Sequence, residues 1–372
     1  MKRVGITGQN GFIGQHLYRV LGLYPQEFER IDFDREFFND ESTLNAFVSK
    51  CDVIIHLAAI NRHNDINTLY STNIELTKKL IKALVATDSE AHVLFSSSSQ
   101  EEQDNLYGQS KKESRELLCA WAQDSKGAFT GIIIPNVFGP FGVPFYNSFI
   151  ATFCHQLTHG ETPIIVKDSK VGLIHVGSLT NIFVELLNNK ESQHYYVVEP
   201  TDEMKVTEVL SNLTEYRELY LKQGIIPKLE TSFDVNLFNT YRSYINLETH
   251  FPAKYTQHTD ARGAFVEIIR LSVGGQVSFS TTVPGVTRGN HFHTRKIERF
   301  AVIKGNAQIQ LRKIGSEKTL TYKLSGEDPA YVDMPVWFTH NITNIGDDEL
   351  FTIFWINEFF DPNDPDTYFE NV

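Results

Sequence analysis

The sequence predicts an α/β fold with a doubly wound parallel sheet, followed by an all-β fold. Up to about residue 136, short and nearly continuous apolar runs alternate with helical stretches, which is typical of parallel strands covered by helices on both faces. A glycine-rich turn follows the first of these runs. Beyond about residue 254 the runs become short, alternating, β-branched and aromatic, with Gly, Pro, Asn and Asp between them, which indicates a sandwich or barrel.

The expected elements follow this order along the chain. In the first part, strands are expected at 2–8, 28–34, 51–59, 91–99 and 129–139, and helices at 12–23, 67–88 and 110–127. Two aromatic-rich helices are expected at 206–224 and 234–246. In the last part, strands are expected at 263–272, 275–285, 298–315, 317–326, 329–335 and 348–357. Because 372 residues exceed one ordinary core, we expect two domains, 1–247 and 248–372.

Composition excludes several classes of partner. The net charge of -12 disfavours nucleic acid and anionic membrane surfaces, which both need a basic footprint. No apolar stretch is long enough to cross a membrane, and the chain opens on a strand, so neither membrane insertion nor a signal peptide is expected. Three dispersed cysteines without a CxxC indicate a reducing compartment. We therefore expect a cytoplasmic protein.

The segment "TGQNGFIG" predicts a phosphate-binding turn between the first strand and the first helix. Its glycines are Gly8, Gly11 and Gly14. Glycine lets the backbone approach a pyrophosphate, and the helix N-terminus supplies N–H groups and the positive end of a dipole. Asp32 and Asp34 follow about 20 residues later, where an acid meets the adenosine ribose. Arg35 is also placed to receive a 2′-phosphate, so these residues leave the choice between NAD(H) and NADP(H) open.

A second motif, "YGQSK", predicts acid–base chemistry. Tyr107 and Lys111 lie one helical turn apart, so their side chains share one face. A nearby ammonium is expected to lower the pKa of the phenol and make Tyr107 a usable proton donor or acceptor. The preceding strand ends in "FSSSSQ", which offers a hydroxyl to the same substrate oxygen.

The segment "GNHFHTRKIE" predicts a metal site in the all-β part. His291 and His293 are alternate residues of a strand and point to the same side, and Glu298 reaches from the next strand. His340 follows in "PVWFTHNITN". Three neutral imidazoles and a carboxylate suit Zn²⁺, Fe²⁺, Mn²⁺ or Ni²⁺.

Residues 1 to about 245 resemble the extended short-chain dehydrogenase/reductase family, whose members have a Rossmann-like fold and act on nucleotide-linked sugars. The resemblance rests on "TGQNGFIG", "HLAA", Asn73, "FSSSS", "YGQSK", "NVFGP" and "LIHV". It implies that Ser98, with Ser97 as the alternative, is the catalytic serine, that Tyr107 is the acid/base, and that Lys111 holds the nicotinamide ribose. The implied cofactor-binding residues are Gly8, Gly11, Phe12, Ile13, Gly14, Asp32, Asp34, Arg35, Leu57, Ala58, Ala59, Tyr107 and Lys111.

The first part departs from that family in two places. Only eight residues separate Ser98 from Tyr107, fewer than in many relatives, so the connection that borders the substrate site is expected to be shorter. Ile133 stands where an arginine often precedes "NVFGP", which removes one polar anchor.

Residues 255 to 372 resemble the cupins, which are jelly-roll domains. The spacing of His291, His293 and Glu298 matches their first motif, and Trp337 stands where the second motif usually has glycine, which is expected to narrow the cavity. The segments "DARGAFVE" and "TRGNHFH" also resemble the dTDP-4-dehydrorhamnose 3,5-epimerase branch. In that branch a histidine and a tyrosine are base and acid, whereas here Phe354 takes the place of the tyrosine, so the epimerase acid and base stay unassigned.

The two chemistries fit one substrate, a nucleotide-linked 4-keto-sugar. A ketone at C4 acidifies the hydrogen on C3, so an epimerase can act only before a reductase removes the ketone. The whole chain resembles bifunctional enzymes of capsular polysaccharide synthesis. That resemblance implies C3 epimerisation of a UDP-2-acetamido-2,6-dideoxy-4-keto-hexose. It further implies reduction with NADPH to UDP-N-acetyl-6-deoxy-L-talosamine on the UDP-N-acetyl-L-fucosamine route, a zinc ion, and a homodimer through the cupin.

Three alternatives stay open at this point. The cupin could be a metal-stabilised dimerisation module without catalysis, which Phe354 favours. The protein could be a non-enzymatic sensor of dinucleotide and sugar, although such proteins tend to lose the tyrosine or the lysine, and Tyr107 and Lys111 are both present. The cupin metal could also be Fe²⁺ that supports dioxygenase chemistry.

Overall fold

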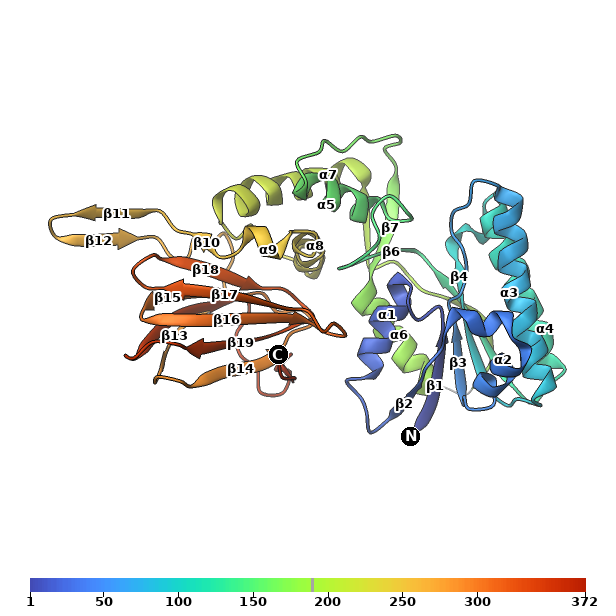
Figure 1. Ribbon diagram of the computed structural model, residues 1–372. Coiled ribbons are helices and arrows are strands. Elements are labelled where there is room, and N and C mark those ends of the chain that lie inside the picture. The colour runs from blue at the N-terminus through green and yellow to red at the C-terminus, as the bar shows by residue number, and fades with distance from the viewer. Residues whose placement is uncertain (189–190) are drawn as a thin grey trace. The chain divides into compact units, whose positions relative to one another are not determined.

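The computed structural model describes residues 1–188 and 191–372 (Figure 1). The chain divides into two compact units. The first comprises 1–152 and 167–206, and the second comprises 153–166 and 207–372. The helical segment 207–247 thus belongs to the same compact unit as the C-terminal strands. The domain boundary between residues 247 and 248, which the sequence suggests, stays a prediction.

The first unit is built on a parallel sheet. In the described residues its spatial order is β2 (Phe28–Ile31), β1 (Lys2–Thr7), β3 (Val53–His56), β4 (His92–Ser98), β5 (Ala128–Ile134) and β8 (Gln193–Val197). A smaller sheet joins β6 (Asn136–Phe138), β7 (Lys170–His175) and β9 (Asp202–Lys205). The order reverses between β1 and β3, and in such sheets ligands bind at the carboxyl ends of the strands on either side of this point.

Helices cover both faces of the parallel sheet (Figure 1). One face carries α1 (Phe12–Leu21) and α6 (Val176–Asn188), which share a core with β1 and β5. The other carries α2 (Glu41–Val48), α3 (Ile66–Ala86) and α4 (Leu106–Gln123), which share a second core with β3 and β4. The doubly wound arrangement is therefore confirmed, and it follows from strands that are apolar on both sides.

Three expected boundaries differ from the structure for local reasons. The strand expected at 28–34 ends at Ile31, because the Asp34 carboxylate accepts the Glu36 N–H and starts a 3-10 helix. The helix expected at 110–127 begins at Leu106, since the Asn105 side chain caps it. The run 129–139 is two strands, β5 and β6, separated at Pro135, which lacks the N–H that a ladder needs.

The second unit begins with helices and ends in strands. Its helices are α5 (Phe149–Thr158, of which the part from Phe153 belongs to this unit), α7 (Val206–Tyr216, from Thr207), α8 (Ser232–Arg242) and α9 (Leu247–His250). A buried ion pair between Arg299 and Asp333, which both lie on strands, connects these strands to the helical segment. Asp333 also accepts a hydrogen bond from the Tyr220 hydroxyl at 2.7 Å, and Arg299 donates one to the Gly224 carbonyl at 2.6 Å.

Two antiparallel sheets form the C-terminal part, so the expected all-β fold is confirmed. One runs β10 (Ala253–Lys254), β18 (Ala330–Met334), β15 (Glu298–Lys304), β20 (Leu350–Ile356) and β13 (Gln276–Thr282). The other runs β17 (Thr319–Ser325), β16 (Asn306–Lys313), β19 (Phe338–Asn344), β14 (Thr287–Phe292) and β21 (Tyr368–Phe369). Their inner faces share one core that includes Val302, Val332, Ile309 and Leu311.

Two expected strands of this part are shorter than predicted. The run 298–315 divides at Gly305, whose φ of 86° allows the turn between β15 and β16. The run 263–272 forms a strand only over β12 (Gly263–Val266), which pairs with β11 (Gln257–Asp260) in a hairpin that projects from the sheets (Figure 1).

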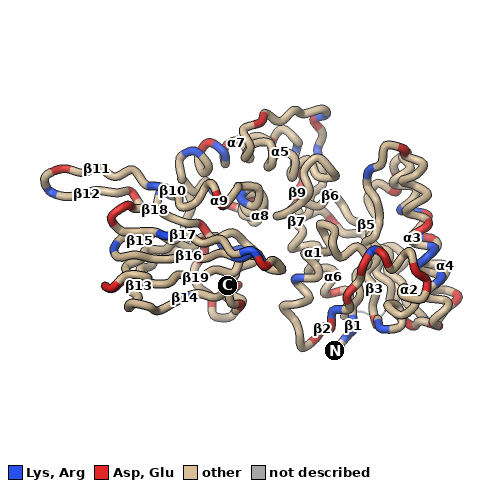
Figure 2. The backbone as a smooth tube through the Cα atoms, viewed as in Figure 1, with Lys and Arg blue, Asp and Glu red and all other residues tan. Residues whose placement is uncertain are grey.

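Charged residues lie on the outer elements of the first unit (Figure 2). Helix α3 carries Lys and Glu, and α4 carries Lys, Arg and Glu, whereas strands β3, β4 and β5 contain no Lys, Arg, Asp or Glu. Within the described part of the chain, no helix combines the length and apolar character that a membrane crossing requires.

Candidate active site and metal centre

The glycine turn has the close approach that the sequence predicts. Gly8 has a φ of 79°, and a side chain there would meet the Ala58 nitrogen at 2.9 Å. A side chain at Gly14 would meet the Gly8 carbonyl at 2.3 Å. The Gly11 N–H donates to that same carbonyl at 2.9 Å and Gly11 starts α1. The turn therefore brings the start of α1 beside the segment that follows β3, where Leu57 and Ala58 lie.

The acidic residues after β2 have different surroundings. Asp32 accepts the Tyr18 hydroxyl at 2.8 Å, so its position is fixed by α1. Asp34 is occupied as the cap of the 3-10 helix. The Arg35 side chain is 90% exposed, with Glu36 at 3.6 Å. Of the three, Asp32 is the one that a side chain of α1 holds in place.

The serine run and the YGQSK motif meet at the end of β4. The Ser97 hydroxyl donates to the buried Glu101 carboxylate, whereas the Ser98 hydroxyl accepts the Gln100 N–H at 3.2 Å and keeps its own proton available. The Lys111 ammonium donates to the Ser96 carbonyl at 2.8 Å and lies 6.0 Å from the centre of the Tyr107 ring. The structure thus favours Ser98 over Ser97 for contact with a substrate.

The expected lowering of the Tyr107 pKa is wrong. Burial, and after it the nearby Tyr146 phenol, raises the pKa of Tyr107 to about 12. Burial also lowers the pKa of Lys111 to about 8. The physical reason is that the ammonium donates to the Ser96 carbonyl of β4, and burial is the largest influence on the pKa of both groups. Tyr107 is accordingly a protonated phenol at neutral pH, as a proton donor must be.

Three further residues belong to the same neighbourhood: Asn73, which is part of the family resemblance, and Glu101 and Tyr146, which no motif identified. Glu101 pairs with Arg115 at 2.9 Å and fixes the short connection between β4 and α4. Asn73 accepts the Ile60 N–H at 2.8 Å and donates to Ser110, which ties the segment after β3 to α4.

Tyr146 is the third of these residues. Its hydroxyl accepts the Asn61 N–H at 3.2 Å, and the preceding Phe145 has a left-handed φ of 60°. This conformation and the hydrogen bond hold the Tyr146 phenol near Tyr107, whose pKa it affects. No local pattern marks Tyr146, because it is 39 positions from Tyr107 in the sequence.

The predicted metal ligands converge. One ligand atom from each of His291, His293, Glu298 and His340 lies within 4.8 Å of the others. The Glu298 carboxylate is 3.1 Å from the His293 Nε2 and 3.2 Å from the His340 Nε2. His291 pairs with His340 across β14 and β19 next to a bulge at Asn290, and Glu298 opens β15.

The donor set fits a divalent cation. The His293 Nε2, the His340 Nε2 and one Glu298 oxygen are buried without a hydrogen bond, although each nitrogen lies close to that oxygen. A divalent cation held between them would satisfy their lone pairs. Burial lowers the pKa of His291 to about 4. Burial acts to raise the pKa of Glu298, but His293 and His340 hold it well below its usual range. A neutral imidazole and an ionised carboxylate are the forms that ligate metals.

Two aromatic residues near this centre explain local features of the sequence. Trp337 has a left-handed φ of 63°, the conformation that glycine adopts easily, and its ring stacks on Phe292 at 5.6 Å. Phe292 alternates with the two histidines along the chain, so the indole packs on a ring that is expected on the opposite side of the strand from them. Phe354 stacks on Phe300 at 5.3 Å, and Phe300 lies 6.2 Å from the His340 ring.

One residue beside the metal ligands could not be found from local spacing. The Asp366 carbonyl accepts the His293 Nδ1–H, and its side chain accepts hydrogen bonds from the loop after His293. Asp366 lies 73 positions from His293, in a turn-rich tail, and only the fold brings the two together.

Comparison with known proteins agrees with this architecture. Residues 4–198 match the model of the NAD dependent epimerase/dehydratase family, and residues 258–368 match that of the polysaccharide biosynthesis C-terminal domain. The chain is 34% identical over 98% of both sequences to UDP-2-acetamido-2,6-beta-L-arabino-hexul-4-ose reductase of Pseudomonas aeruginosa.

Solved structures give the same result. The crystal structure of the capsular polysaccharide assembling protein CapF from Staphylococcus aureus covers 100% of both chains, with 31% identity and a TM-score of 0.64. RMD from Pseudomonas aeruginosa, complexed with NADPH, covers 59% of this chain and 83% of its own, with 20% identity and a TM-score of 0.53, which shows the shared fold of the first part. The chain belongs to the NAD dependent epimerase/dehydratase family and, over its full length, to its CapF-type members, nucleotide-sugar modifying enzymes of polysaccharide biosynthesis.

Proposed function

We propose that the chain is a bifunctional enzyme that acts on a UDP-2-acetamido-2,6-dideoxy-4-keto-hexose. The C-terminal domain, a cupin, inverts C3, and the N-terminal domain then reduces the C4 ketone with NADPH to UDP-N-acetyl-6-deoxy-L-talosamine. The observation that carries the proposal is the full-length similarity to a UDP-linked hexul-4-ose reductase in a chain that keeps Ser98, Tyr107 and Lys111 together. The relative's substrate has the C4 ketone that both half-reactions need.

The reductive half follows from the protonation state of Tyr107. When bound, a reduced nicotinamide would supply the hydride for C4, and the ketone oxygen must gain a proton. Tyr107, protonated at neutral pH because burial raises its pKa to about 12, donates that proton. The Ser98 hydroxyl orients the same oxygen, and Lys111, whose ammonium donates to the Ser96 carbonyl, would hold the nicotinamide ribose. The balance is one hydride and one proton added, with oxidised cofactor released.

The cofactor site follows from the glycine turn and the residues around it. The turn at Gly8–Gly14 and the start of α1 suit a pyrophosphate, and Asp32 suits a ribose hydroxyl. The exposed Arg35 guanidinium supports NADPH as the preferred cofactor, because it can reach a 2′-phosphate. NADH is the expected weaker alternative.

The epimerising half uses the acidity of C3 beside the ketone. His291, His293, Glu298 and His340 would hold a divalent cation, with Zn²⁺ favoured by the three imidazoles, and the cation would supply positive charge to an enolate oxygen. A base removes the C3 proton, and re-protonation from the opposite face inverts the carbon. Reduction must come second, because it removes the ketone that makes C3 acidic.

The first test concerns reduction. The Tyr107→Phe variant should oxidise NADPH with the 4-keto substrate about 10²- to 10⁴-fold more slowly than wild type, because the proton donor is missing. Cofactor affinity, measured by fluorescence titration, should stay the same, since the phenyl ring keeps its packing. Oxidation of NADPH at the wild-type rate by this variant would contradict the role of Tyr107.

The second test concerns epimerisation. In deuterated water without reduced cofactor, the Tyr107→Phe variant should incorporate deuterium at C3, because that step does not use the reductase site. A His291→Ala variant, or wild type treated with a chelator, should incorporate much less. Mass spectrometry and proton NMR of the sugar measure the label, and absence of label in wild type would reject the epimerase.

A second candidate function is favoured by one observation. The aromatic pair Phe300 and Phe354 lies beside His340, at the place where an acid such as tyrosine would be needed. In this alternative the reductase stays, and the cupin serves as a metal-stabilised dimerisation module. The same labelling experiment separates the two candidates, because the module gives no C3 label.

A further inference from the structure

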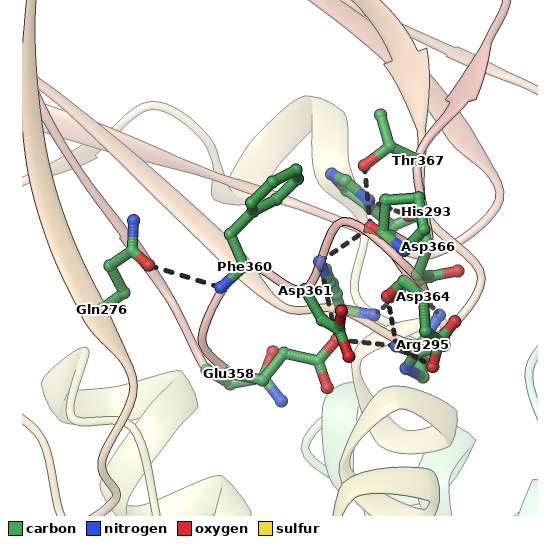
Figure 3. Close-up of polar contacts among 12 residues, drawn as sticks. Gln276, His293, Arg295, Glu358, Phe360, Asp361, Asp364, Asp366 and Thr367 are labelled. Carbon is green, nitrogen blue, oxygen red and sulfur yellow. Dashed lines mark hydrogen bonds and ion pairs between the residues drawn. The ribbon is translucent and has the colours of Figure 1, made fainter.

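The C-terminal tail crosses the loop that connects two of the clustered ligands (Figure 3). That loop, Thr294–Ile297, runs from His293 at the end of β14 to Glu298 at the start of β15. The tail, residues 358–367, approaches it from a part of the sequence about 70 positions away. Any displacement of the loop would move His293 and Glu298 relative to each other.

The side chain of Asp366 binds the backbone of this loop. It is 3% exposed. One carboxylate oxygen accepts the Thr294 N–H at 3.0 Å and the Thr294 hydroxyl at 2.6 Å. The other accepts the N–H groups of Arg295 and Lys296, each at 3.0 Å. Three consecutive backbone donors around one anion form charge-assisted hydrogen bonds, which are stronger than neutral ones.

The backbone of Asp366 acts on His293 directly. Its carbonyl accepts a hydrogen bond from the His293 Nδ1, which places the proton on that nitrogen and leaves a lone pair on the Nε2. The Nε2 is the atom that lies 3.1 Å from Glu298. Without the carbonyl, the ring could adopt the other tautomer or rotate. Asp366 reaches both contacts with a φ of 40°, which aspartate and asparagine tolerate better than most residues.

Other contacts hold the tail in place. Arg295 donates to the Asp364 carboxylate at 3.0 Å, and the buried Lys296 donates to the Pro365 carbonyl at 2.7 Å. On the other side, the Phe360 N–H donates to Gln276 on β13 at 3.4 Å. The Arg295 pair is exposed, with Asp364 67% exposed, so it contributes less than the buried Asp366 contacts.

We propose that Asp366 is a positioning residue of the metal centre, and that through it the C-terminal tail sets the affinity for the metal. The inference rests on the proposed metal-binding function of His291, His293, Glu298 and His340. Asp366 does not ligate the ion. Its carboxylate fixes the loop between two ligands, and its carbonyl fixes the tautomer of one of them. Such outer partners of ligating histidines change metal affinity by about 10- to 100-fold when they are replaced.

The experiment compares three variants of the full-length chain in their affinity for Zn²⁺. Asp366→Asn keeps the size, the carbonyl and the tolerance of positive φ, but presents an amide N–H₂ to backbone donors. Thr294→Val removes one of the bonds and leaves Asp366 unchanged. Asp364→Asn is the matched control on the same tail. Affinity is measured by competition with a chromophoric chelator, and ligand geometry by the visible spectrum of Co²⁺-loaded protein.

Asp366→Asn should bind Zn²⁺ about 10- to 100-fold more weakly than wild type and show an altered Co²⁺ spectrum. Thr294→Val should lose a few-fold in affinity, and Asp364→Asn should stay within about two-fold of wild type. The thermal midpoint of the metal-free proteins separates this effect from a general loss of stability.

Wild-type affinity in both Asp366→Asn and Thr294→Val would overturn the inference, while the metal centre itself would stand. A wild-type protein that binds neither Zn²⁺ nor Co²⁺ would instead overturn the proposed metal-binding function. The two failures are therefore distinguishable, because the first is a difference between variants and the second concerns wild type alone.

Discussion

Lys111 shows how a single residue connects stability to function. Its ammonium is 4% exposed and lies on the Ser96 carbonyl, without a carboxylate in direct contact. Burial lowers its pKa from 10.5 to about 8. Above pH 8 the unfolded chain therefore binds more protons at this residue than the folded chain does, so the free energy of unfolding rises with pH between 8 and about 10.

We expect the free energy of unfolding of wild type to rise relative to that of Lys111→Met by up to about 3 kcal/mol between pH 8 and 10. Below pH 8 the difference should be constant, because the lysine is then protonated in both states. Urea denaturation at four pH values measures it. The neighbouring exposed Lys112→Met is the control, and an equal pH dependence in both variants would disagree with a buried ammonium.

Among single residues, Tyr107, Lys111 and the four metal-centre residues were identifiable from spacing, because each lies in a short motif on one strand or helix. The pKa of Tyr107 could not be predicted from spacing, because it depends on burial and on Tyr146, which a loop brings back to the site. The expectation of a lowered pKa considered only the lysine one turn away.

At the scale of elements, the connection between β4 and α4 is held by one buried ion pair. The Glu101 carboxylate accepts hydrogen bonds from the Ser97 hydroxyl and from the Arg115 guanidinium. The Glu101 side chain is 4% exposed and the Arg115 side chain is 13% exposed. Only eight residues separate Ser98 from Tyr107 in this connection. The pair thus fixes the end of β4, where Ser98 lies.

We expect Glu101→Ala to lower the free energy of unfolding by about 3 kcal/mol, because it leaves the largely buried Arg115 guanidinium without its carboxylate. Glu75→Ala, which removes an exposed pair with Lys79 on α3, should cost less than about 1 kcal/mol. Chemical denaturation of both variants measures the contrast. A cost for Glu101→Ala no greater than that for Glu75→Ala would show that water reaches Arg115.

The boundaries of helices and strands could be predicted where turn-forming residues mark them in the sequence. They were missed where the side chain of a capping residue, which is not part of the hydrophobic pattern, sets the end of the element. The 3-10 helix after β2 depends on the Asp34 side chain, and α4 begins early because of Asn105. The hydrophobic period indicated the core of each element, but a cap shifts the ends without changing that period.

At the scale of the whole molecule, β13 supports the proposed homodimer through the cupin. It is the last strand of its sheet among the described residues, with β20 as its neighbour. Its outward side chains, Val277 and Phe279, are 59% and 72% exposed, while its inward residues Ser278 and Ser280 are polar. An apolar outer face on an edge strand is typical of a surface that another chain covers.

Size-exclusion chromatography with light scattering should therefore give wild type about twice the chain mass of 42.5 kDa. Phe279→Lys should shift the protein toward monomer, because a charge would enter the covered face. Val166→Lys, at a 98% exposed position elsewhere, should not. A monomeric wild type would contradict the homodimer. A dimer that persists unchanged in Phe279→Lys would show that its interface does not include β13.

By itself, the sequence determined the order of an α/β and an all-β fold, the glycine turn, the YGQSK pair and the spacing of the metal ligands. These are properties of neighbours along a strand or a helix, and regular geometry converts spacing into position. Only the tertiary structure decided what surrounds those groups. Glu101 accepts a hydrogen bond from Ser97, and Tyr146 lies near Tyr107. Trp337 stacks on Phe292, and the Asp366 carbonyl accepts a hydrogen bond from His293. The physical reason is that burial, charge and hydrogen-bond partners come from residues far apart in the chain, which no local pattern encodes.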